Sequence, residues 1–177
     1  TSPYKFYQFW MNAEDQAVEK LLKLFTFLSL EEIEEIMESQ RKSPELRKAQ
    51  KRLALEVTTI VHGEESARTA ERVSRILFGD SFEPRDLSLD ILEMLAAETP
   101  GGTAPRSFPA SLADLLVSTG ACPSKSEVRR LIRGGRLYVN GVKIPDEDAS
   151  VSEDALLGGK FLFVRLGKKR VFMIQFE

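Results

Sequence analysis

Apolar residues recur at helical spacing along the first part of the chain. Aromatic and aliphatic residues three or four positions apart predict one helix that ends near residue 11 and a second helix at 18–28. The segment 12–15 between them is expected to form a break and a helix cap. Each helix should bury its apolar stripe, and the stripe residues are Phe6, Phe9, Trp10, Val18, Leu21, Leu22, Leu24, Phe25 and Leu28.

The helical period continues to about residue 97. It predicts a third helix at 30–39, whose early glutamates complement the positive end of the helix dipole. A proline is expected to open a longer helix at 44–62, and two more amphipathic helices are expected at 64–78 and 87–97. Residues 1–97 are therefore predicted to form an all-α domain.

Proline, glycine and small polar residues concentrate after this helical part and predict a linker at 98–107. Beyond the linker both helical and strand periods occur, so residues 108–177 are predicted to form a small α+β domain. The predicted fold class of the whole chain is therefore α+β. The elements expected in the second domain are helices at 111–119 and 125–133 and strands near 136–139, 160–166 and 170–176, the last two forming a hairpin.

The formal net charge of −2 hides an uneven distribution of charged residues. Residues 1–100 hold 13 basic and 19 acidic residues, whereas residues 101–177 hold 12 basic and 8 acidic ones. A local excess of Lys and Arg attracts anions even where the whole chain is slightly acidic. The C-terminal part is therefore the expected anion-binding part.

Two groups of basic residues lie in this C-terminal part. In the first group, four members follow 4, 4 and 3 spacing and should share one face of the helix predicted at 125–133. The second group surrounds the turn of the predicted hairpin. Together they predict a phosphate-binding surface, with a merely solvated charged face as the alternative. The members are Lys125, Arg129, Arg130, Arg133 and Arg136 in the first group and Arg165, Lys168, Lys169 and Arg170 in the second.

Catalytic and metal-binding chemistry is not indicated by the sequence. The single histidine, His62, and the single cysteine, Cys122, have no ligand spacing or neighbouring base, so no metal site and no nucleophile is expected. The glycine pairs lack the strand–loop–helix setting of a nucleotide site and are interpreted as turns. No apolar run approaches the roughly 20 residues that span a bilayer. A cytoplasmic location is expected.

Four segments of the chain resemble the C-terminal half of bacterial-type tyrosyl-tRNA synthetases. They are TSPYKFYQFWMN, LKLFTFLSLEEI, AQKRLALEVTTIVHGEE and the C-terminal SKSEVRRLI…LYVNG…FVRLGKKRVFMIQF. The match covers nearly the whole chain in order, and from about residue 108 it is similar to the S-four type RNA-binding domain of these enzymes. The resemblance implies that the chain is a fragment that follows a Rossmann-type catalytic domain.

The resemblance also implies a function in tRNA recognition. In this family the helical domain reads the anticodon region, and the C-terminal domain meets the long variable arm and anticodon stem of tyrosine tRNA. ATP and tyrosine are used by the catalytic domain, which is absent here, so the chain itself should need no cofactor and should not aminoacylate. The expected partner is tyrosine tRNA, with no DNA and no membrane. The fragment is expected to be monomeric, although the full-length enzyme is a homodimer.

Individual positions follow from the resemblance. Asp15 matches an acid near the anticodon, where a carboxylate can accept from base amino groups, and a helix N-cap is its alternative role. Lys125 and Arg129 match basic positions of the S-four helix, and Arg130 and Arg133 are added from helix geometry alone. The basic hairpin that relatives press against tRNA is matched by Arg165, Lys168, Lys169 and Arg170.

Two other classes of function remain open from the sequence. One is a stand-alone S-four-type RNA-binding or ribosome-associated protein without a ligase relation. The other is a protein-interaction module whose acidic helices, including the one at 30–39, dock a partner while the cations only increase solubility. RNA binding at low salt would separate tRNA recognition and stand-alone RNA binding, which both require it, from the protein-interaction module, which does not.

Overall fold

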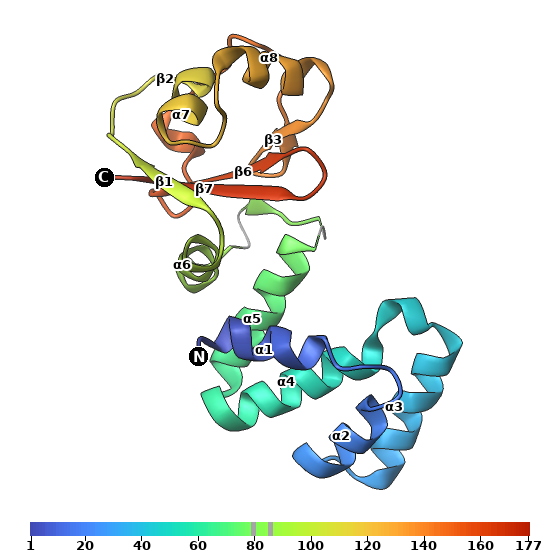
Figure 1. Ribbon diagram of the computed structural model, residues 1–177. Helices are drawn as coiled ribbons and strands as arrows, with labels where there is room; N and C mark the ends of the chain where they lie inside the picture. Colours follow the sequence, from blue (N-terminus) through green and yellow to red (C-terminus); the bar gives the residue numbers. More distant parts are fainter. Residues whose placement is uncertain (79–80, 85–86) are drawn as a thin grey trace. The chain divides into compact units, whose positions relative to one another are not determined.

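The computed structural model describes residues 1–78, 81–84 and 87–177 and divides into two compact units, Thr1–Ser74 and Arg75–Glu177. The first unit is helical and the second combines helices with a sheet (Figure 1). The predicted fold class, an α-helical part followed by a small α+β domain, is confirmed. The unit boundary differs from the predicted one, because the helix expected at 87–97 belongs to the second unit.

The first unit is built from helices that succeed one another through short breaks. Ser29 and Glu32 form a reciprocal capping box at the start of α3, which satisfies backbone N–H groups that no helix turn can pair. Gly63, with φ +87°, ends α4 and lets the chain reverse into the next helix. The helices are α1 Pro3–Met11, α2 Val18–Phe25, α3 Leu30–Lys42, the 3₁₀ turn η1 Pro44–Leu46, α4 Lys48–His62 and α5 Glu64–Leu77, which runs on into the second unit.

The core of the first unit uses only part of the predicted aromatic stripe. Tyr7, which the stripe omitted, is almost fully buried, whereas Phe9 and Phe25 are 69% and 48% exposed. Helix α1 packs on α4, where Phe6 meets His62 edge-on and Phe6 and Trp10 pack against the core, whereas Phe9 stays exposed. The residues buried together with α2 are Val18, Leu22, Ile33, Met37, Ala49, Leu53 and Val57.

The single helix predicted at 44–62 is wrong at its start. Residues Pro44–Leu46 form a 3₁₀ turn, and Arg47 follows with a left-handed backbone, φ +49°. The Arg47 guanidinium donates to the carbonyl oxygens of Met11 and Ala13 at 2.8 and 3.2 Å. These two hydrogen bonds tie Arg47 to the chain between α1 and α2. They offer a physical reason for the left-handed backbone of Arg47, which is unusual for a residue other than glycine.

Among the described residues, the second unit has a five-stranded sheet in the order β1-β7-β6-β3-β4. β1 runs parallel to β7 and the other neighbours are antiparallel, with β6 and β7 forming the predicted hairpin. A separate pair joins β2 and β5. The elements are α6 Leu89–Glu98, β1 Gly101–Ala104, β2 Ala110–Ser111, α7 Leu112–Ser118, α8 Lys125–Arg133, β3 Leu137–Val139, β4 Val142–Lys143, β5 Ser150–Val151, the 3₁₀ turn η3 Glu153–Ala155, β6 Phe161–Leu166 and β7 Arg170–Phe176.

Both faces of the β6–β7 hairpin are covered. Alternate residues such as Leu162 and Ile174 join a core with α7 and α8 on one face. Their neighbours, such as Phe163 and Met173, are buried on the opposite face, where α6 packs against β7 (Figure 1). These two strands therefore read as nearly continuous apolar runs, as strands buried on both faces do.

The predicted linker at 98–107 is wrong in its central part. Gly101–Ala104 form β1, which adds a parallel edge strand to β7. The two glycines are needed for close approach, because a Cβ on Gly102 would lie 2.7 Å from the carbonyl oxygen of Thr119 and one on Gly101 would lie 2.5 Å from that of Met173. Their interpretation as turn residues is also wrong.

Candidate RNA interface

Helix α8 is fixed in place by both ends and by one apolar face. The Ser124 hydroxyl accepts from the Glu127 N–H at 3.2 Å, and the helix ends at Gly134. Val128 and Ile132 are buried in the core of the second unit. The basic residues of α8 consequently lie on its solvent-exposed side. Their predicted positions on one regular helix, Lys125–Arg133, are confirmed.

The four cations of α8 are paired with carboxylates. Lys125 Nζ lies 2.6 Å from Asp114 Oδ1 of α7, and Arg130 lies 2.7 Å from Glu127 on the adjacent turn. The loop after β4 brings Glu147 against the helix. Both Arg129, at 4.0 Å, and Arg133 reach this one carboxylate.

These pairs shift the pKa values of the carboxyl groups. Hydrogen bonding to Lys125 lowers the pKa of Asp114, and hydrogen bonding to Arg130 lowers that of Glu127. Hydrogen bonding and attraction to Arg133 hold the pKa of Glu147 below its usual range, with a smaller contribution from Arg129. All three carboxylates are therefore ionised at neutral pH and compete with any phosphate for the α8 cations.

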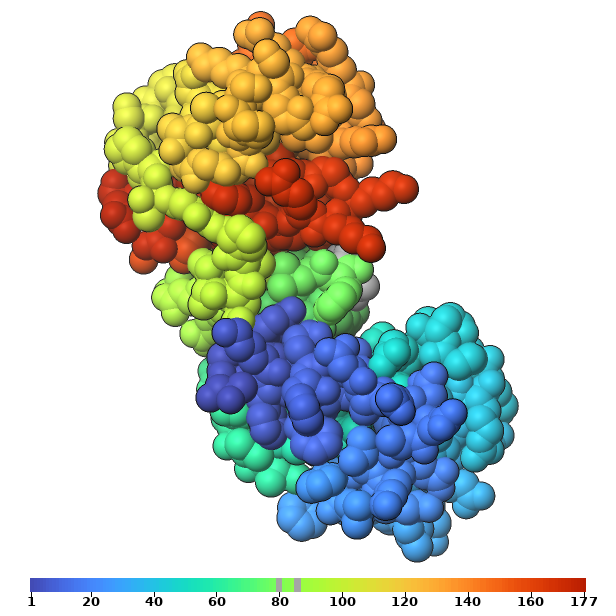
Figure 2. All heavy atoms as spheres, in the orientation of Figure 1, coloured from blue at the N-terminus to red at the C-terminus, as the bar shows by residue number. Residues whose placement is uncertain are grey.

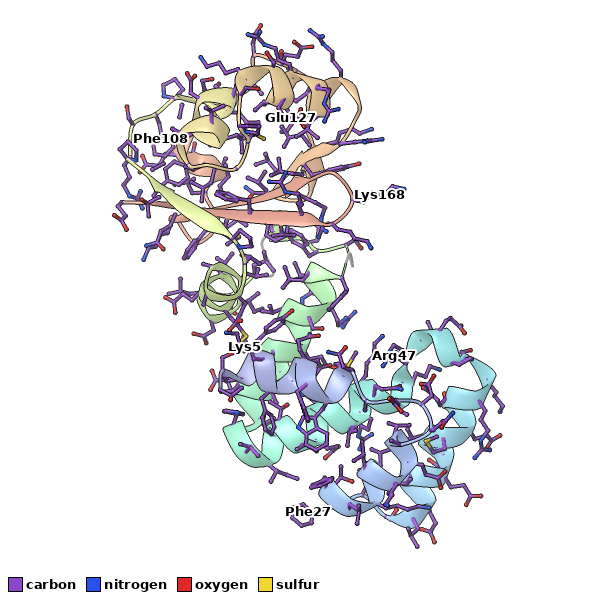
Figure 3. All side chains as sticks on the ribbon, in the orientation of Figure 1. Lys5, Phe27, Arg47, Phe108, Glu127 and Lys168 are labelled. Carbon is purple, nitrogen blue, oxygen red and sulfur yellow. The ribbon has the colours of Figure 1, made fainter. Side chains whose placement is uncertain are left out.

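The turn between β6 and β7 holds two exposed lysines. Lys168 and Lys169 follow Gly167, which takes φ +71°, and both side chains are exposed. No carboxylate of the described part of the chain pairs with either ammonium group. Lys168 projects away from the end of the hairpin (Figure 3), and side chains of the red C-terminal segment protrude from the surface of the unit (Figure 2). This turn is the strongest candidate phosphate contact.

The two arginines beside this turn are held by backbone carbonyls. Arg165 Nη2 donates to the Ile76 oxygen at 2.9 Å, and its guanidinium lies 5.7 Å from the centre of the Phe163 ring. Burial lowers the pKa of Arg165, although an arginine remains charged at neutral pH. Arg170 Nη2 donates to the Ala121 oxygen at 2.9 Å. Both side chains are thus oriented by the fold and keep further N–H groups for a ligand.

Asp15 lies in the first unit at the start of the segment that leads into α2. Its Oδ1 accepts from the side-chain amides of Gln50 at 2.6 Å and Gln40 at 3.4 Å, which are both buried. The N-cap of α2 is Ala17, which makes no side-chain cap bond, so the alternative role of Asp15 as a helix cap is wrong. Asp15 is an exposed carboxylate in a fixed orientation.

The prediction that Arg136 shares a helical face with Lys125, Arg129 and Arg133 is wrong, because α8 ends at Arg133 and Arg136 directly precedes β3. It lines a cleft with Tyr138, Arg165 and Lys168, which combines members of both predicted basic groups. Sequence reasoning did not assign a site role to Tyr138. The sequence did contain a signal for this role of Tyr138, because it lies between the buried residues Leu137 and Val139. Neighbouring strand residues point to opposite faces, so the Tyr138 ring lies on the face of the sheet opposite to theirs.

Cys122 and His62 both take part in packing. Cys122 is buried and burial raises the pKa of its thiol, so the reactive thiolate is disfavoured. His62 packs edge-on against Phe6, with ring centres 5.1 Å apart. Within residues 1–78, 81–84 and 87–177, no group of three His, Cys, Asp or Glu side chains is placed to hold a metal ion, and no helix is long and apolar enough to cross a membrane.

Two family models match the chain. Residues 1–79 match the class I tRNA synthetases specific for tryptophan and tyrosine (W and Y), and residues 91–174 match the tyrosine–tRNA ligase SYY-like C-terminal domain. Each match falls largely on one structural unit. The second match contains both α8 and the β6–β7 turn.

Two tyrosine–tRNA ligases agree with these matches. The tyrosine–tRNA ligase of Anaeromyxobacter dehalogenans is 45% identical over 99% of this chain and 42% of its own length. That of Geobacillus stearothermophilus is 44% identical over 99% of this chain and 41% of its own length. A solved, C-terminally truncated mitochondrial tyrosyl-tRNA synthetase from Aspergillus nidulans is 44% identical over 44% of this chain and 23% of its own, with a TM-score of 0.44. The chain thus spans about two fifths of the length of these two ligases.

Proposed function

Because the chain belongs to the tyrosine–tRNA ligase family and matches the C-terminal part of its members, we propose that it is a tRNA-binding portion that recognises tyrosine tRNA. The observation that carries this proposal is the pair of exposed lysines, Lys168 and Lys169, at the β6–β7 turn, without a carboxylate partner among the described residues. Ammonium groups held on a rigid hairpin suit the phosphates of a structured RNA.

The second unit would contact the long variable arm and anticodon stem mainly through phosphates. Lys168 and Lys169 make the first contacts in this proposal, and the anchored Arg165 and Arg170 add directed N–H groups. The α8 cations contribute only after they leave their carboxylates. Because exposed ion pairs are weak, a polyanion can displace them at small cost.

The first unit would meet the anticodon region through Asp15. Two buried glutamine amides occupy one oxygen of this carboxylate, and no described residue donates to the other oxygen. The free oxygen can accept from the amino group of an unpaired base. Because the two glutamine amides fix the orientation of the Asp15 carboxylate, its contact with a base would be directional. The lysines of the second unit cannot provide such a directional contact.

This proposal places the chain in the cytoplasm, as a monomer by itself, with no cofactor of its own. The use of ATP and tyrosine belongs to the remainder of the longer relatives. Tyrosylation is accordingly a proposed activity of the longer protein, to which this chain contributes tRNA binding.

A footprinting experiment tests the proposal. The parent chain is bound to tyrosine tRNA and to an unrelated tRNA with a short variable arm, and cleavage protection is mapped on both. Protection is expected on the anticodon stem and long arm of tyrosine tRNA. Uniform protection of both RNAs, or none on either, contradicts the proposal.

The same experiment is repeated with Lys168→Gln/Lys169→Gln, which should weaken binding to both RNAs by about tenfold because two phosphate contacts are lost. The double variant Lys20→Gln/Lys42→Gln in the first unit removes the same charge from exposed positions of helices α2 and α3, and it should bind within about twofold of the parent. Equal loss in both double variants would mean that only total charge matters.

A further inference from the structure

A cleft of about 490 Å³ lies on the face of the second unit's sheet that faces away from α7 and α8. Its volume falls within the roughly 300 to 1,000 Å³ typical of small-ligand sites. Three cations and two partly exposed aromatic rings form its walls. These side chains are Arg136, Arg165, Lys168, Tyr138 and Phe82.

Strand pairing explains why these residues meet. Tyr138 of β3 lies opposite Arg165 of β6 on one side and opposite Lys143 of β4 on the other. The Gly167 N–H donates to the Arg136 oxygen at 2.8 Å, which ties the β6–β7 turn to the start of β3. The cleft is thus built in one unit from residues of β3 and β6, from the turns beside these strands and from Ser81 and Phe82.

The charged side chains among the described lining residues of the cleft all have the same sign. None of its described lining residues is acidic, and a smaller adjoining hollow adds Lys169 beside Arg165 and Lys168. The Lys143 ammonium also reaches the rim, because it lies against Gly135, a lining residue. On α8, by contrast, each cation has a carboxylate beside it. The cleft is therefore better suited to an anion than α8 is.

The aromatic side chains restrict which anion fits. Phe82 stands edge-on against the buried Phe163, with ring centres 5.1 Å apart and planes at 81°, and lies against Gly141. Tyr138 is half-buried and lines the same space. Flat apolar surfaces beside positive charges favour a ligand that has both a planar ring and a phosphate, which is a nucleotide.

We propose that this cleft binds one unpaired nucleotide of an RNA. The base stacks against Tyr138 and Phe82, and the phosphates on either side of it pair with Arg136 and Lys168. Arg165, fixed by the Ile76 carbonyl, lies behind the base and adds positive charge. This inference rests on the proposed function, since it assigns a second mode of contact, with a base rather than with the backbone, to the same RNA-binding unit.

The test uses the full chain and two RNA hairpins. One hairpin carries a single bulged nucleotide, which is the fluorescent base 2-aminopurine, and the other is identical but lacks the bulge. The bulged hairpin should bind about 5- to 50-fold more tightly, as expected for one stacked base. Tyr138→Leu should abolish this preference, whereas Tyr138→Phe should keep it because the ring remains. The exposed Arg136→Gln, which carries little risk of misfolding, should reduce the preference, and Lys42→Gln in the first unit should leave it unchanged.

The outcomes separate this inference from the proposed function. Equal binding of both hairpins rejects the nucleotide site while RNA binding stands, and binding of neither rejects both. A bulge preference that survives Tyr138→Leu and Arg136→Gln places the base elsewhere and also overturns the inference. Adenosine 5′-monophosphate is titrated alone as a further arm. Tyr138-dependent binding of this mononucleotide without a bulge preference would assign the cleft to a free nucleotide instead.

Discussion

The basic residues of this chain differ mainly in whether a carboxylate already pairs with them. The spacing of Lys125, Arg129 and Arg133 placed them together on a helix, but Asp114 and Glu147 meet them from other elements. Lys168 and Lys169 have no such neighbour in the described part of the chain. The distinction arises because carboxylates distant in sequence approach α8, whereas the β6–β7 turn extends away from them.

The Glu147 carboxylate should reduce the affinity of the chain for RNA. Glu147→Gln keeps the size of the side chain and releases Arg129 and Arg133, so RNA affinity should increase about two- to fivefold at low salt. The measurement is a binding titration with tyrosine tRNA. Glu38→Gln, which removes an acid paired with Lys42 on α3, is the matched control and should change affinity less. An unchanged affinity for Glu147→Gln would mean that these arginines do not reach the RNA.

At the scale of elements, strand β1 shows how composition can mislead. The segment around Gly101 and Gly102 has the composition of a flexible linker, yet it pairs in parallel with β7 along four residues. Small residues are present because Thr119 and Met173 come too close for a Cβ atom. A glycine pair selected for close packing looks the same in sequence as one selected for flexibility.

Gly102→Ala distinguishes the two explanations. The added Cβ would meet the Thr119 carbonyl oxygen at 2.7 Å and its Cβ at 2.9 Å, so unfolding free energy should fall by about 1 to 3 kcal/mol. Thr103→Ala on the same strand is the control, because Thr103 is exposed and its loss should be small. The measurement is denaturant unfolding followed by circular dichroism. Identical midpoints for Gly102→Ala and the parent would show that this segment is a tether and not a strand.

At the scale of the whole molecule, net charge does not identify the RNA-binding part. With the boundary at residues 74 and 75, the second unit contains 14 basic and 14 acidic residues. The excess counted for residues 101–177 disappears, because the acidic segment before β1 belongs to the same unit. RNA binding must therefore depend on where the individual cations lie. Only a few phosphates of the RNA are then expected to be neutralised at one time.

The salt dependence of tRNA binding measures that number. A log–log slope of about −2 to −4 between affinity and salt concentration is expected if about three to five phosphates are neutralised. Lys168→Gln/Lys169→Gln should make the slope shallower by about 1 to 2, because two of these contacts are lost. A flat response in the parent would exclude a phosphate-based mode of binding.

The sequence by itself determined the properties that depend on near neighbours. Helical and strand periods predicted α8, β6, β7 and the helical character of residues 1–74, because each period reflects which side of an element faces the core. The β6–β7 turn and its lysines were predicted for the same reason. Resemblance in four segments indicated the family, which similarity along the whole chain bears out.

Only the tertiary structure decided the properties that depend on residues far apart in the chain. The pairing of Glu147 with α8, the strand at Gly101–Ala104, the two amides behind Asp15 and the cleft around Tyr138 each join segments between about 14 and 90 residues apart. A local period contains no information on such contacts, since packing energy and electrostatic attraction depend on distance in space. The difference between paired and unpaired cations, on which the proposed function rests, arises from such long-range contacts.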